Sequence, residues 1–310
     1  MAGVRELVRK PVRMVRRRFA MGAEFARDYR AYRATAAPTD DAASAELSGI
    51  HLETQVTKDY HRVEKGLSLR SPKHPFGDAV DRRLAMLVPA GAAIDEGYQA
   101  FAVDAREALA GWNTAGSLSD IVSPMAAPSD AIDPELLEQF FATRHSVRDF
   151  DEHRPVDPRL IDEAVRLAGC TPSVCNRQAA RVHVFEGAED SARILAHQNG
   201  NAGFRHHVRM VMIVTVERGL FAGAGERNQR WVDGGLFAMT LVWALHGLGL
   251  SSCMLNWSMT NARTDALRQE AGIPASEDVI CLIAVGHAPA EGYRVARSPK
   301  RPLSQVLTRH

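Results

Sequence analysis

The sequence has little of several features that define protein classes. Four cysteines in 310 residues are too few for a disulfide-built fold, and no second pair at zinc-ligand spacing accompanies Cys170 and Cys175. The longest apolar run, 234–245, is too short to span a bilayer and predicts a buried helix. No early apolar run ends in a small-residue cleavage site, so we expect a cytoplasmic protein with reduced thiols.

The chain also carries little net charge. Its formal charge of +1 gives no reason to expect a specific nucleic-acid partner. The balance hides an asymmetry, because residues 1–33 hold ten Arg or Lys against three acids and sum to +7, leaving −6 for the rest. Apolar residues interleaved with these bases predict a helix over 1–36, interrupted at Pro11, that suits an acidic membrane surface or acidic partner. A solvated, poorly ordered arm is the favoured interpretation, and docking on such a surface is the alternative.

Three segments follow from the patterning. We expect a basic helical arm and linker at 1–49, a helical extension and linker at 50–132, and a folded domain at 133–310. In the extension, His61 and Glu64 lie one helical turn apart, but no further metal ligands are evident, so a hydrogen-bonded structural pair is favoured and no metal is expected. A turn-rich centre at 61–69 would make Gly66 a helix C-cap.

The segment 133–310 mixes helices and strands without regular alternation. Asp133-Pro134 and Asp157-Pro158 each predict a helix start with an N-cap aspartate. The first helix has an apolar stripe at 136, 137, 140 and 141. Further helices are expected at 231–246 and 261–271, and strands at 181–186, 208–216, 250–255 and 279–285. This order predicts an α+β fold with a central, mostly antiparallel sheet flanked by helices.

Three short segments contain groups suited to an anionic, hydrogen-bonding ligand. The first provides guanidinium, imidazole and hydroxyl donors for a phosphate at Arg144, His145, Ser146 and Arg148. The second follows a predicted helix and provides amides that match the polar edge of a flavin, at Pro172, Ser173, Asn176 and Gln178. The third is a basic C-terminus at Arg294, Arg297, Lys300 and Arg301. Taken alone, each has an ordinary alternative: complementing a helix dipole, forming a turn, or lying solvated on the surface.

Together these segments resemble the nitroreductase-like family of FMN-dependent oxidoreductases over residues 133–310. The likeness rests on five motifs in the family's order: Arg-His-Ser-Val-Arg-Asp-Phe at 144–150, Pro-Ser-x-x-Asn-x-Gln at 172–178, Trp-Val-Asp-Gly-Gly at 231–235, Gly-Leu-Gly-Leu-Ser-Ser at 247–252, and Lys-Arg-Pro-Leu at 300–303. The resemblance implies a homodimer with FMN between the subunits.

The resemblance also implies roles for individual residues. Arg144 would contact the flavin phosphate, His145 and Ser146 would line the phosphate–ribityl region, and Asn176 with Gln178 would lie against the ring. Ser251 and Ser252 would lie along the flavin and contact it through their backbone groups. Lys300 or Arg301 of the C-terminal segment would bind the phosphate, with Arg297 as another possible match. Arg148 and Arg177 are candidates for stabilising negative charge at the ring. No catalytic side chain is identified.

Two departures from the family pattern bear on the substrate. Ala179 and Ala180 stand where a proline and a bulky aromatic are common, and the stretch between Val216 and Trp231 is short for a pocket cover. The expected activity is transfer of two electrons from NAD(P)H through FMN to a nitroaromatic, quinone or similar acceptor. The alternatives are a dedicated biosynthetic flavoenzyme that does not use NAD(P)H, and a membrane- or polyanion-docking protein with a flavin-fold domain.

Overall fold

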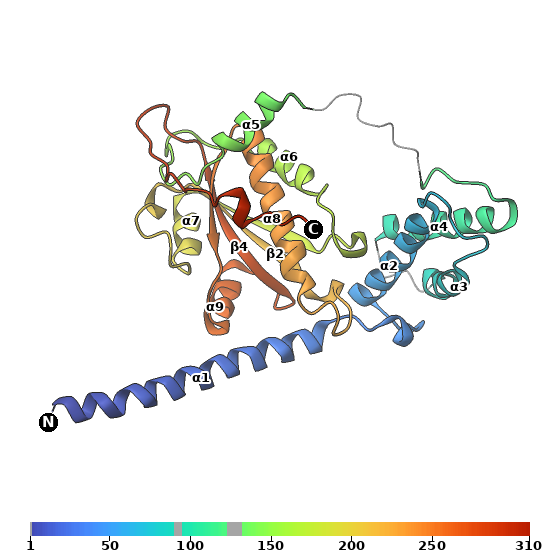
Figure 1. The fold of residues 1–310 in the computed structure, drawn as a ribbon, viewed down its shortest axis with the longest axis horizontal. Helices are drawn as coiled ribbons and strands as arrows, with labels where there is room; N and C mark the ends of the chain where they lie inside the picture. The colour runs from blue at the N-terminus through green and yellow to red at the C-terminus, as the bar shows by residue number, and fades with distance from the viewer. Residues whose placement is uncertain (1, 90–94, 123–131) are drawn as a thin grey trace.

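A four-stranded antiparallel sheet is the centre of the C-terminal domain. The computed structural model describes residues 2–89, 95–122 and 132–310, with side chains from Phe19 onward (Figure 1). The strands lie in the order β1-β2-β4-β3. Their bounds are β1 Ala180–Glu186, β2 Met210–Glu217, β3 Ser251–Asn256 and β4 Glu277–Gly286. These bounds match the predicted strands to within about two residues, and the α+β class is confirmed.

Helices cover both faces of the sheet. Because side chains alternate along a strand, Met212 and Ile283 pack under α6 (Pro158–Ala168) and α8 (Gln229–Gly247). Ile213 and Leu282 face the opposite layer, which contains α7 (Ala188–Leu195) and α9 (Asn261–Ala271). Short 3-10 turns complete the domain: η3 (Val174–Asn176), η4 (Arg205–His207), η5 (Arg218–Leu220) and η6 (Leu303–Gln305).

The predicted helix starts are confirmed by their capping contacts. The Asp133 carboxylate accepts hydrogen bonds from the backbone of Glu135 and Leu136 at the start of α5 (Pro134–Thr143). Asp157 accepts from Arg159 N at the start of α6. The apolar stripe of α5 lies mostly outward, however, with Leu136 and Phe141 more than half exposed. This face is therefore left uncovered by the chain's own core.

The helical extension has a hydrophobic cluster of its own. It consists of α2 (Gly49–Leu67), α3 (Asp78–Leu87) and α4 (Glu96–Ala115), packed around Leu52, Val63 and Leu109. The predicted turn at 61–69 and the C-cap role of Gly66 are wrong, because α2 continues to Leu67 and Ser68 follows it in a right-handed conformation. Glycine is needed at 66 for packing instead: a Cβ there would lie 2.5 Å from Phe76 Cε2.

A single long helix precedes the extension. α1 (Ala2–Thr35) continues through Pro11, so the predicted interruption is wrong, and η1 (Asp40–Ala42) follows in the expected linker. Glu24 Oε2 accepts a hydrogen bond of 2.7 Å from Asn261 N, the first residue of α9, whose own N-cap Thr260 makes no side-chain cap. Tyr32 also donates to Gly223 O over 2.7 Å. No helix in the described ranges is long and apolar enough to cross a bilayer.

Candidate flavin site

The basic segment after α5 lies directly against β3. Ser146 forms a parallel bridge with Ser252, and Val147 N donates to Ser252 O over 3.0 Å. Ser252 is buried, whereas Arg148 is exposed, and its guanidinium lies 3.4 Å from Ser146 O. Two segments far apart in the sequence therefore place hydroxyls, backbone groups and guanidinium donors side by side.

Aromatic rings at the end of α8 support Arg144. Its guanidinium carbon lies 5.7 Å from the centre of the Trp243 ring, which also contacts Phe141 at 4.5 Å between centroids. Burial lowers the pKa of neighbouring His246; its hydrogen bond to Phe140 O opposes this effect, and the positive charges of Arg144 and His145 add to it. Burial and the charge of Arg144 both disfavour a further cation at His246.

The loop at 171–178 is fixed to the first half of α8. Val174 N donates to Asp233 Oδ2 over 3.0 Å, and Gln178 N donates to Ser173 Oγ over 3.0 Å. Asn176 and Gln178 have positive φ angles of 52° and 47°, a conformation that is uncommon for residues other than glycine. Such backbone persists where the surroundings enforce it and often marks binding sites. Asp233 belongs to the Trp-Val-Asp-Gly-Gly motif at 231–235, and the sequence alone does not predict that it anchors this loop.

Arg177 does not occupy the position that the sequence suggested for it. Its side chain is 1% exposed, its Nη2 lies 2.8 Å from Glu226 Oε2, and its Nε donates to Val174 O over 3.1 Å. The guanidinium also lies 5.7 Å from the Phe221 ring. Because these contacts engage it beneath the loop, Arg177 acts as a support for residues 174–178, and its candidate role at a flavin ring is not favoured.

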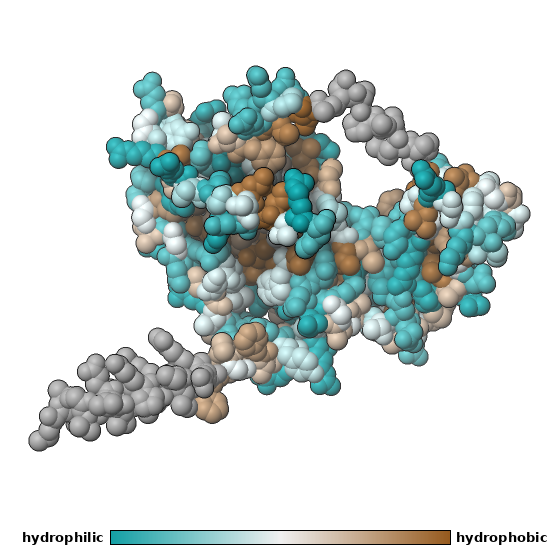
Figure 2. All heavy atoms as spheres, in the orientation of Figure 1, coloured by the Kyte–Doolittle hydropathy of each residue, from teal (hydrophilic) through white to brown (hydrophobic). Residues whose placement is uncertain are grey.

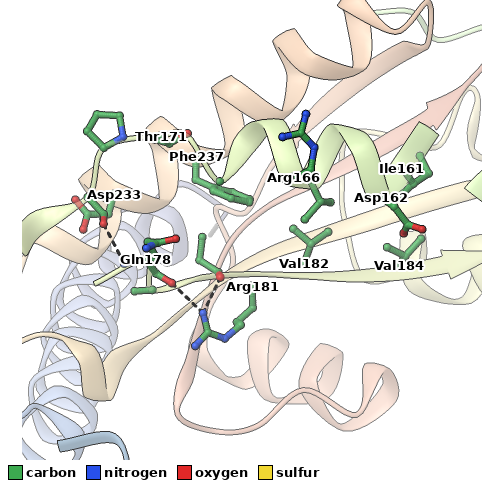
Figure 3. Close-up of a pocket in the computed structure, with 16 residues that line it drawn as sticks. Ile161, Asp162, Arg166, Thr171, Gln178, Arg181, Val182, Val184, Asp233 and Phe237 are labelled. Carbon is green, nitrogen blue, oxygen red and sulfur yellow. Dashed lines mark hydrogen bonds between the residues drawn. The ribbon is translucent and has the colours of Figure 1, made fainter. Parts of the chain in front are cut away.

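A cavity of about 620 Å³ opens beside this loop (Figure 3). Val182 and Val184 project into it from β1, below Ile161 of α6, while Phe237 of α8 lies between the loop and Val182. Polar groups line the end nearest the loop, including those of Thr171, Ser173, Gln178 and Asp233, and Pro172 lies among them. The side chain of Arg181 packs against the end of the loop, where its Nη1 donates to Gln178 O and Ala180 O at 3.0 and 2.8 Å. The cavity is thus apolar with a polar rim, as ligand pockets commonly are.

The predicted residues fall into two groups and a remainder. Arg144, His145, Ser146 and Arg148 gather with Ser251 and Ser252 near the end of α8, whereas Pro172, Ser173, Asn176 and Gln178 lie near its beginning. The ten residues from Asp233 to Trp243 correspond to about 15 Å along a helix. Lys300 and Arg301 are exposed in the tail and join neither group; Arg301 contacts Gln305 at 3.3 Å. A single chain therefore does not assemble the whole predicted site.

The other polar pairs singled out from the sequence are structural. His61 Nδ1 lies 3.2 Å from Glu64 Oε2, as the favoured interpretation required. The structure adds a pair that the sequence did not predict, in which His207 Nδ1 lies 2.5 Å from Glu152 Oε1. Within the part of the chain that the structure describes, no three His, Cys, Asp or Glu side chains are grouped to hold a metal ion. The four cysteines are free thiols.

Part of the C-terminal domain matches a family of known proteins. Residues 141–202 and 196–287 match the model of the Nitroreductase family, and no curated protein matches the chain. Similar solved structures include a Desulfovibrio desulfuricans protein in complex with FMN: 22% identity, 58% of this chain and 98% of that one covered, TM-score 0.48. An FMN-dependent nitroreductase from Clostridium difficile has 17% identity, 55% and 98% coverage and a TM-score of 0.47. A Nitroreductase family protein from Streptococcus pneumoniae has 17% identity, with 56% of this chain and 100% of that one covered and a TM-score of 0.48. The family match spans all four strands.

Proposed function

We propose that this chain, whose residues 141–287 match the Nitroreductase family model, binds FMN and is a two-electron flavin oxidoreductase of the cytoplasm. The observation that carries the proposal is the pairing of Ser146 with Ser252, which brings the basic segment onto β3. Bound FMN would supply the redox chemistry, accepting a hydride from reduced nicotinamide and passing two electrons to a nitroaromatic, quinone or similar acceptor.

The basic segment fits a phosphate group. Arg144 and Arg148 provide charged donors, Ser146 provides a hydroxyl, and residues 144–148 include no acid. Stacking on Trp243 holds Arg144 in place, so less side-chain freedom is lost when an anion binds. The resemblance adds His145 to this group and assigns Lys300 or Arg301 to the same phosphate from the tail.

The loop at 172–178 fits the polar edge of a flavin ring. Asn176 and Gln178 each carry an amide donor and acceptor and are exposed at the loop surface. Asp233 and Arg177 fix the loop from beneath, so these amides are oriented before ligand binds. The apolar cavity beside Gln178 would exclude water from an acceptor.

Dimerisation would join the two groups of residues. Hydrophobic side chains gather over α8 and beside α5 (Figure 2), and those more than two-fifths exposed are Leu136, Leu137, Phe141, Trp231, Val232 and Leu236. In a two-fold dimer packed along α8, the beginning of one helix lies opposite the end of the other. The loop at 172–178 of one subunit would then meet the 144–148 segment of its partner.

A dedicated biosynthetic flavoenzyme is the second candidate. Between β2 and α8, only η5 and turns are present, so no long helix covers the pocket there. In its place α2 packs against both η3 and η5. A loop held in place by a fixed helical extension suits one particular substrate better than a broad range of acceptors, and such an enzyme would not need NAD(P)H.

The visible absorbance spectrum of the purified protein tests the proposal. Flavin bands that bleach with anaerobic NADH or NADPH support the general reductase, and bands that bleach only with dithionite support the dedicated flavoenzyme. A colourless protein that takes up no added FMN contradicts both. Arg144→Gln should weaken FMN binding by roughly 10- to 100-fold, the effect of losing one charge-assisted hydrogen bond. Riboflavin lacks the phosphate and should bind the variant as before; Arg205→Gln, an exposed arginine of η4, is the matched control.

A further inference from the structure

The first half of α1 is a basic helix that the flavin site does not use. Residues 1–18 hold seven Arg or Lys and one acid, and their valines recur at 4, 8, 12 and 15, the spacing of one helical stripe. Each of these valines is followed by an arginine, at 5, 9, 13 and 16. The sequence of α1 therefore combines a row of apolar residues with a row of bases over its whole first half.

Apolar side chains remain exposed further along the same helix. Met21, Phe25 and Tyr29 are spaced four apart, and each is at least 60% exposed, as is Phe19. Single exposed apolar residues are ordinary, but a row of large ones on one helix indicates a surface that is covered by something else. The helix extends well beyond the body of the domain (Figure 1).

The second half of α1 is firmly attached to the body. Glu24 caps α9 through Asn261, Arg27 forms an ion pair with Asp265, and Arg218 donates to Ala31 O and Thr35 Oγ1 at 3.5 and 3.4 Å. These contacts hold residues 24–35 of α1 against α9 and η5. Whatever binds the first half would therefore hold the flavin domain at a set orientation.

We propose that residues 2–21 of α1 dock this protein on an anionic lipid surface. Bases attract acidic headgroups, and interleaved Val, Leu and Phe side chains enter the boundary between headgroups and acyl chains. A nucleic acid fits less well. The first 34 residues include no Ser, Thr, Asn or Gln, the side chains that commonly join Arg and Lys at phosphates and read base edges. Nucleic-acid binding also has no need for the apolar row.

Co-sedimentation of the full chain with phosphatidylcholine vesicles, with and without phosphatidylglycerol, tests this proposal. We expect binding only to the anionic vesicles and weaker binding at high salt. Each base near such a surface raises the affinity for anionic vesicles roughly fivefold. The triple variant Arg16→Gln, Arg17→Gln, Arg18→Gln should therefore bind roughly 100-fold more weakly. The control removes three exposed bases of the helical extension, Arg70→Gln, Lys73→Gln and Arg82→Gln, and should bind as wild type.

A second variant separates lipid from other polyanions. Val8→Ser, Val12→Ser and Val15→Ser keep every charge and should still abolish vesicle binding, while far-UV circular dichroism and thermal unfolding report that the body is intact. Wild-type protein that ignores anionic vesicles would overturn the proposal, as would equal losses in the control triple. Duplex DNA binding that survives the valine changes, together with vesicle binding that also survives them, would replace it with a purely electrostatic polyanion site. None of these readouts depends on bound FMN.

Discussion

Val174 N and Asp233 Oδ2 lie 3.0 Å apart, and this hydrogen bond joins the strained loop after α6 to the first half of α8. Gln229 Nε2 donates to the other carboxylate oxygen over 2.8 Å, so both oxygens are engaged in a site where Asp233 is 5% exposed. The loop that is proposed to face the flavin thus depends on one carboxylate of another element.

Asp233→Ala should loosen that loop. The part-buried Val174 N–H would lose its acceptor, at a cost of about 1–3 kcal/mol in the free energy of unfolding. FMN affinity should fall with it, since Asn176 and Gln178 would no longer be held in place. Urea unfolding and FMN titration measure the two effects. Asp233→Asn keeps one acceptor oxygen and should recover most of the affinity; equal losses in both variants would contradict the anchoring role.

Removing the carboxylate of Glu226 should lower the free energy of unfolding more than removing that of Asp233. Glu226→Gln leaves the guanidinium of Arg177 buried without its ion-pair partner, and breaking a buried pair in this way costs about 3–5 kcal/mol. Chemical denaturation would measure the loss. The double variant Arg177→Met, Glu226→Gln removes both charges and should regain much of the stability. A double variant as unstable as the single one would show that the unpaired charge is not the cause.

Two adjacent glycines of α8 should respond in opposite ways to alanine. A Cβ at Gly234 would lie 2.6 Å from Ile280 Cγ1, whereas one at Gly235 meets no atom within 4 Å. Gly234→Ala should therefore cost about 1–3 kcal/mol through overpacking between α8 and β4. Gly235→Ala should stabilise the helix by up to about 1 kcal/mol. Urea midpoints compare them, and equal losses at both positions would show that Ile280 is not the obstacle.

Acid should destabilise the helical extension through Asp40. Burial opposes ionisation of this carboxyl, but hydrogen bonds from Lys58 and Arg62 outweigh it and lower its pKa from 3.8 to about 2. A carboxyl whose pKa is lower in the folded state stabilises the fold fully above pH 4 and loses that contribution as the pH falls toward 2. The contribution is about 1–2 kcal/mol after allowance for partial exposure.

The variant Asp40→Asn should therefore lower stability at pH 7 and flatten the decline between pH 4 and pH 2. Urea unfolding at several pH values measures both. Asp41→Asn, at the exposed neighbouring position, is the matched control and should follow the wild-type profile. If the free energy of unfolding of the Asp40 variant fell between pH 4 and pH 2 as steeply as that of the wild type, Asp40 would not be the source of the acid sensitivity.

Local signals in the sequence were sufficient for the four strands and for α5, α6, α8 and α9. The aspartates at 133 and 157 cap the helices that they predict, and α9 ends at Ala271 before Gly272 in the left-handed conformation. Such signals act over a few residues, because a cap or an apolar stripe depends on neighbours within one or two turns. Motifs that follow one another in a family's order are likewise read along the chain.

Only the tertiary structure decided which distant residues meet. Asp233 anchors Val174, which lies 59 residues away in the sequence, and Glu24 caps α9 from 237 residues away. The ring of Phe76 leaves room for no residue larger than glycine at position 66. Arg177 looked like a ligand residue, yet it is buried against Glu226, while the apolar stripe of α5 looked like core and is exposed. Composition sets how much apolar surface and charge a chain has, but the packing of α8 on the sheet determines which of those groups are buried, paired or left at the surface.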